Sequence, residues 1–134
     1  GGWKKMKNLK IKPKKFKRKI KKKINTNSVY NYYGLIEQTG SIFLECPNCN
    51  CFKTNSYSEI LIRDKDLNIL TSGKKGFVQL ISLLPSSYPG HIILTEDIGE
   101  IIKNDKNCNI CKNKTKFIIH GRFAKSVIRG CSDI

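Results

Sequence analysis

The sequence predicts a strand-rich, mixed α/β chain with one basic amphipathic helix near its N-terminus. Two patterns in the sequence predict this class. The run 77–84 is almost continuously apolar, which is typical of a strand that is buried on both faces. Phe16, Ile20 and Ile24 recur at every fourth position, which is the period of a helix with one buried stripe, here surrounded by lysines.

The other elements follow from local composition. The helix is expected at 14–24. Further strands are expected at 28–32, 41–45, 57–63, 91–95, 98–103, 117–120 and 124–128. The polar segments 46–56 and 104–114 are expected to be loops, and Glu96-Asp97 should form a corner between two strands. The turn at 71–76 lacks the spacing of a phosphate-binding loop, so we interpret it as a hairpin connection.

Length and termini limit the class of protein. A chain of 134 residues forms one domain at most. It begins at Gly1 without a methionine, which indicates the downstream piece of a longer protein. It contains no secretory segment and no run long enough to span a bilayer, so we expect a cytoplasmic location.

The net charge of +16 is concentrated in residues 1–24, which hold twelve lysines, one arginine and no acid. We interpret this charge as the solvated face of a helix. The alternative is an arm that binds nucleic acid or an anionic membrane. Nucleic acid is disfavoured because no aromatic residues are interleaved with the lysines to stack on bases.

Six cysteines in a chain without an export signal argue against a disulfide framework. Two pairs have the spacing of a zinc knuckle, in which both sulfurs reach one ion: Cys46, Cys49, Cys108 and Cys111. These four are the predicted zinc ligands, with Cys51 as a spare or substitute. The alternative is five free thiols on two loops. His91 and His120 are expected to be strand residues rather than ligands.

Three segments carry residues that suit a nucleotide. Tyr33, Gly34 and Glu37 follow a β-prone run, where a tyrosine ring can stack on a purine and a carboxylate can hold Mg²⁺. Asp97 can accept hydrogen bonds from two ribose hydroxyls, and the planar fork of Arg122 suits phosphate or ribose oxygens. Each residue alone also fits a plain structural role, such as a turn or a surface ion pair.

Together these segments form a resemblance. The chain resembles the adenylate-forming enzyme superfamily at three of its motifs. In chain order, the matching segments are Tyr33-Gly34-Leu35-Ile36-Glu37, Leu94-Thr95-Glu96-Asp97-Ile98-Gly99 and Gly121-Arg122. The chain resembles one family more closely, the acyl-protein synthetases of bioluminescence systems (long-chain-fatty-acid–luciferin-component ligase). This closer resemblance lies in residues 1–5, 82–99 and 129–133. The resemblance runs over nearly the whole chain and covers only the C-terminal part of that family's length.

The resemblance implies a fold and a reaction. Residues 1–134 would be a single partial domain, the C-terminal portion of the large domain of an adenylate-forming enzyme. The parent ligase would use ATP and Mg²⁺ to convert a fatty or other carboxylic acid into an acyl adenylate, and would then pass the acyl group to a cysteine thiol. An acyl-accepting reductase would be a partner.

The resemblance also implies residue roles. Tyr33 would face adenine, with Gly34 beside it, and Glu37 would hold Mg²⁺. Asp97 would bind the ribose hydroxyls, Arg122 would contact the ribose or phosphate, and Cys131 would accept the acyl group.

Departures from the family pattern imply that the chain alone is inactive. Ile36 replaces a threonine of the first motif, Glu96 replaces a glycine of the second, and the phosphate-binding loop is missing from the sequence. Two other classes stay open: a small basic zinc-containing nucleic-acid-binding protein, and a degenerate relic of the ligase.

Overall fold

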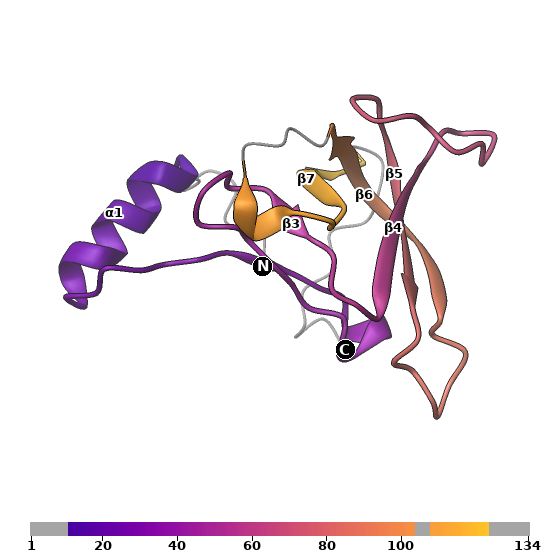
Figure 1. The fold of residues 1–134 in the computed structure, drawn as a ribbon, viewed down its shortest axis with the longest axis horizontal. Coiled ribbons are helices and arrows are strands. Elements are labelled where there is room, and N and C mark those ends of the chain that lie inside the picture. The colour runs from indigo at the N-terminus through magenta and orange to yellow at the C-terminus, as the bar shows by residue number, and fades with distance from the viewer. Residues whose placement is uncertain (1–10, 104–107, 124–134) are drawn as a thin grey trace.

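The computed structural model describes residues 11–103 and 108–123 (Figure 1). Its elements, in chain order, are α1 (Pro13–Lys23), β1 (Tyr32–Tyr33), the 3₁₀ helix η2 (Ile36–Gln38), β2 (Phe43–Leu44), β3 (Phe52–Lys53), β4 (Ser58–Arg63), β5 (Lys75–Ser82), β6 (Ile92–Ile102), the 3₁₀ helix η3 (Asn109–Cys111) and β7 (Lys116–Arg122). This arrangement confirms the predicted strand-rich class with one α-helix near the N-terminus.

The strands form two antiparallel sheets. β1 pairs with β2, and the larger sheet has the strand order β3-β7-β6-β5-β4. Sequence neighbours β4, β5 and β6 pair directly with one another. The short strand β3 instead pairs with β7, which lies far along the chain. This non-local pairing brings the two cysteine-rich segments to the same edge of the sheet.

The core lies on one face of the larger sheet. Its fully buried apolar side chains are Phe43, Ile60, Ile62, Val78, Leu80 and Phe117. Along β5 the buried positions alternate with half-buried ones, so the prediction that 77–84 is buried on both faces is wrong. An antiparallel sheet can keep one face on the core while the other face stays partly exposed, even where the sequence is apolar at both.

The predicted corner at Glu96-Asp97 is also wrong, because β6 runs continuously from Ile92 to Ile102. The pairing of β6 with β7 shifts register between Ile98 and Gly99. The strand therefore has a bulge directly after Glu96-Asp97, and not a corner. Gly99 is needed there, since a Cβ atom would lie 2.7 Å from Cγ2 of Val78 and 2.9 Å from the carbonyl oxygen of Ile118.

Helix α1 lies apart from the larger sheet (Figure 1). Pro13 occupies its first turn, and Lys21, Lys22 and Lys23 occupy its last turn, where positive charge complements the helix dipole. None of its side chains is buried, so the prediction of a buried stripe is wrong. The helix is joined to the rest of the chain by an ion pair between Lys17 and Glu45. Across the described residues, no helix is both long enough and apolar enough to cross a membrane.

Candidate functional site

Four cysteine side chains meet at the β3–β7 edge of the larger sheet. Their sulfur atoms all lie within 4.8 Å of one another, and they belong to Cys46, Cys49, Cys108 and Cys111. The Cys46 and Cys108 sulfurs are 3.5 Å apart, and the Cys49 and Cys111 sulfurs are 3.6 Å apart. Zinc–sulfur bonds of about 2.3 Å in a tetrahedron place sulfurs about 3.8 Å apart. The cluster therefore has the size of a four-thiolate metal site.

Local turns shape the first knuckle. The Cys46 amide donates to the carbonyl oxygen of Cys51 at 2.8 Å, and the Asn50 amide donates to the carbonyl oxygen of Cys46 at 2.9 Å. Asn50 has a φ of 56°, a left-handed conformation that asparagine tolerates better than most residues. The next residues form β3, where Phe52 pairs with Phe117 of β7. This pairing brings the second knuckle, which directly precedes β7, alongside the first.

The environment of the cluster favours a thiolate at Cys46. Burial raises the pKa of the Cys46 thiol, but hydrogen bonds from the amides of Cys49 and Asn48 and from the thiols of Cys111 and Cys108 together outweigh burial and lower the pKa to about 6. Burial raises the pKa of Cys111 above its usual range, and the neighbouring cysteines add to that shift. Cys46, Cys108 and Cys111 are buried and Cys49 is half-buried. The four predicted ligands are thus brought together in a nearly closed site.

Cys51 lies outside this set. Its sulfur donates to the carbonyl oxygen of Cys49 at 3.5 Å and is not one of the four sulfurs that lie within 4.8 Å of one another. Burial, followed by the charge of Cys49, raises its pKa to about 11. His120 lies in β7, as predicted, 3.4 Å from a carboxylate oxygen of Glu100, and His91 directly precedes β6. Neither histidine belongs to the cysteine cluster.

A second polar group centres on Asp97. The Tyr33 hydroxyl donates to Oδ2 of Asp97 at 2.8 Å, and Nε of Arg122 lies 3.7 Å from Oδ1. Asp97 and Arg122 are cross-strand partners of β6 and β7, whereas Tyr33 comes from β1 of the smaller sheet. Three of the residues predicted to bind a nucleotide therefore meet around one carboxylate.

Thr95 holds the backbone of Asp97, a role that was not predicted from the sequence although the second motif includes this threonine. Its hydroxyl donates to the carbonyl oxygen of Val78 at 2.9 Å and accepts the amide of Asp97 at 3.1 Å. These two bonds link the backbone of Asp97 to the neighbouring strand β5. A threonine two residues before an acid in an apolar strand is the sequence feature that could have pointed to this role.

The Tyr33 ring packs into the aromatic part of the core. Ring centroids of Phe43, Phe52 and Phe117 lie 6.3, 6.1 and 6.1 Å from its own. Burial, followed by the charge of Asp97, raises the pKa of Tyr33 well above its usual value of 10.0. The phenol therefore stays protonated and donates to Asp97. A role in stacking on adenine stays a prediction.

The remaining predicted site residues are placed as follows. Gly34 follows β1, and a Cβ atom there would lie 3.1 Å from the carbonyl oxygen of Ser41. Glu37 is exposed on η2, and no hydrogen bond or ion pair of the described residues joins it to Asp97. Cys131 lies outside the described residues.

Alkaline pH is expected to destabilise the chain through Tyr33. The Tyr33 phenol ionises at a higher pH in the folded chain than in the unfolded chain, so its contribution to stability is complete below about pH 10 and is lost as the pH rises further. We expect Tyr33→Phe to cost about 1–2 kcal/mol at pH 8 and to flatten the fall in stability above pH 10. Urea unfolding at pH 8 to 11 measures both effects. Tyr57→Phe, at a side chain that is 60% exposed, is the control and should follow the unmodified chain throughout.

Comparison with known proteins gives one family. The family model described as "Acyl-protein synthetase, LuxE" matches residues 1–134. Comparison with curated proteins finds no match.

Proposed function

The chain belongs to the acyl-protein synthetase family, LuxE, and from this membership we propose that it is part of an ATP-dependent ligase. The ligase activates a fatty or other carboxylic acid as an acyl adenylate and passes the acyl group to a cysteine thiol. The convergence of Asp97, Arg122 and Tyr33 is the observation that supports this proposal most directly. These residues come from three segments that lie far apart in the sequence.

Each residue has a defined part in the proposed reaction. A carboxylate oxygen of the acid attacks the α-phosphorus of ATP, and pyrophosphate leaves. Asp97 accepts hydrogen bonds from the ribose hydroxyls, and Arg122 contacts the ribose or phosphate oxygens. Tyr33 and Gly34 form the adenine side of the site. Glu37 would hold Mg²⁺, which neutralises charge on the phosphates when it is bound.

Cys131 is the proposed acyl acceptor. Its thiolate attacks the carbonyl carbon of the acyl adenylate, so that a thioester forms and AMP leaves. The acyl group then passes to an acceptor such as a reductase. A labelled fatty acid should therefore attach to the active ligase through a bond that hydroxylamine cleaves. Labelling that persists unchanged in Cys131→Ser would rule out this acceptor.

We also propose that the cysteine cluster binds one Zn²⁺ ion. The four ligands are those predicted from the sequence, and their sulfurs are close enough for tetrahedral coordination. Because four protein thiolates fill every position of such a site, the ion would be structural rather than catalytic. It would hold the segment before β3 against the segment before β7.

Binding of an acyl adenylate analogue tests the ligase proposal without requiring turnover. We expect Asp97→Asn to weaken binding of a non-hydrolysable acyl-adenosine sulfamate by about 10- to 100-fold, because hydrogen bonds to a charged group contribute about 1.5–3 kcal/mol. Titration calorimetry on the chain, or on the longer ligase that carries it, measures the effect. Asp66→Asn makes the same charge change at an exposed turn and should bind normally. Equal affinity of the two variants would contradict the ribose role of Asp97.

A further inference from the structure

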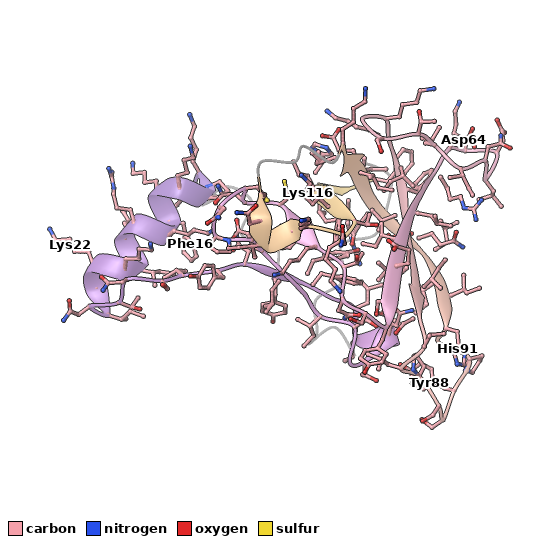
Figure 2. The ribbon with its side chains drawn as sticks, viewed as in Figure 1. Phe16, Lys22, Asp64, Tyr88, His91 and Lys116 are labelled. Atoms are coloured by element: carbon pink, nitrogen blue, oxygen red, sulfur yellow. The ribbon has the colours of Figure 1, made fainter. Side chains whose placement is uncertain are left out.

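Helix α1 carries an unusual density of positive charge. Its eleven residues, Pro13–Lys23, include seven lysines and one arginine and no acidic residue. Positive side chains four positions apart repel one another and weaken an isolated helix. One of them, Lys17, is paired with Glu45. Figure 2 shows Lys22 pointing away from the sheets, into solvent. An anionic surface would relieve the repulsion along the helix.

The same helix has an apolar stripe that stays partly accessible to solvent. Ile11, Phe16, Ile20 and Ile24 line an open hollow of about 310 Å³, and Lys19 and Lys23 stand at its sides. Ile24 is 64% exposed and Phe16 is 39% exposed. A stripe of this kind is normally buried against a protein core. Here it is covered only in part, since Ile11 and Ile20 are half-buried and Phe16 and Ile24 are exposed.

We propose that α1 is a docking surface for an anionic lipid bilayer. A basic helix with apolar residues along one side lies in the bilayer interface, where the apolar side chains enter the acyl boundary and the lysines reach the headgroups. The stems of Lys19 and Lys23 can cover apolar surface while their ammonium groups contact lipid phosphates. A nucleic acid could pair its phosphates with the lysines, but it would offer no apolar environment in which the isoleucines could be buried. This inference rests on α1 alone and does not depend on the proposed ligase activity.

Vesicle binding by the full chain tests this proposal. The chain should co-float with vesicles of phosphatidylglycerol and phosphatidylcholine at 0.1 M salt, and not with vesicles of phosphatidylcholine alone. Lys21→Glu combined with Lys22→Glu should lower the partition coefficient at least tenfold. The matched control combines Lys65→Glu with Lys74→Glu, which makes the same charge change at exposed turns away from α1 and should retain most of the binding.

A second pair of substitutions separates lipid from nucleic acid. Ile20→Gln combined with Ile24→Gln keeps the charge and a good helix former, so it should reduce vesicle binding at least fivefold without affecting binding to a DNA duplex. Circular dichroism and urea unfolding confirm that each variant is folded. Vesicle binding that is equal in the two lysine variants would overturn the proposal. The proposal would also be overturned if the chain bound the duplex more tightly than the vesicles and the isoleucine substitutions left vesicle binding unchanged.

Discussion

Replacing Cys111 with serine is expected to remove stoichiometric zinc and to unfold the chain, because the β3–β7 edge of the sheet loses the ion that would hold it together. Cys111 is 2% exposed within the four-sulfur cluster, and a serine hydroxyl is a poor substitute for a thiolate ligand. Structural zinc contributes about 10–16 kcal/mol to the folding of zinc-finger peptides, whereas whole domains are stable by about 5–15 kcal/mol. Losing part of that contribution should be enough to unfold the chain at 37 °C. Elemental analysis of the purified protein and thermal unfolding with and without chelator measure the two effects.

Cys51→Ser is the matched control for this experiment. Cys51 is also buried, at 7% exposure, and lies two residues from Cys49, but its sulfur is directed to a backbone carbonyl. This variant should retain one zinc ion per chain and an unfolding midpoint within a few degrees of the unmodified chain. Zinc lost from Cys51→Ser and kept by Cys111→Ser would refute the assigned ligand set. A chelator that leaves the midpoint of the unmodified chain unchanged would refute the structural role.

The zinc-site prediction depended on local and non-local information to different extents. Each knuckle is a short turn, so the spacing of Cys46 and Cys49, or of Cys108 and Cys111, reveals it directly. Whether the two knuckles meet depends on the pairing of β3 with β7. Strand β3 has only two residues, so its sequence does not predict this pairing. The exclusion of Cys51 depends on the direction of one side chain, which spacing cannot give.

Secondary structure was predictable where the periodicity was strong. The helix at 14–24 and the strand at 57–63 match α1 and β4 to within one residue at each end. The corner at Glu96-Asp97 was wrong because two adjacent acids resemble a turn, whereas the chain accommodates them within β6 beside a bulge. The burial of the α1 stripe was wrong because helical periodicity shows which residues share a face and not what covers that face.

The group around Asp97 shows the same division. Sequence motifs pointed to Tyr33, Asp97 and Arg122, and the antiparallel register places Arg122 opposite Asp97. The orientation of the Tyr33 ring was not accessible from the sequence, because it is set by packing against three phenylalanines from β2, β3 and β7. The aromatic cluster that stabilises the fold thus also positions the hydroxyl that holds Asp97.

Phe117→Ala is expected to be the most damaging substitution in the apolar core. Phe117 is fully buried, and its ring centroid lies 5.4 Å from that of Phe43 and 5.5 Å from that of Phe52. Its ring also packs against that of Tyr33, with 6.1 Å between the two centroids, so Phe117 joins both sheets. Truncation of a buried phenylalanine to alanine costs about 3–5 kcal/mol, which is a large part of the stability of a small domain. Urea unfolding monitored by circular dichroism gives the change.

Two variants show whether this cost arises from packing at that position. Phe117→Leu leaves an apolar side chain in the site and should cost about 1.5 kcal/mol. Phe123→Ala removes the same atoms from a side chain that is 44% exposed directly after β7, so it should cost less than half as much as Phe117→Ala. Equal losses for Phe117→Ala and Phe123→Ala would mean that the aromatic cluster is not the core. If the cluster is the core, Phe117→Ala should also weaken the hydrogen bond from Tyr33 to Asp97, because the ring that carries the hydroxyl would lose its support. An acyl adenylate analogue should then bind more weakly to Phe117→Ala than to Phe123→Ala under conditions where both variants remain folded.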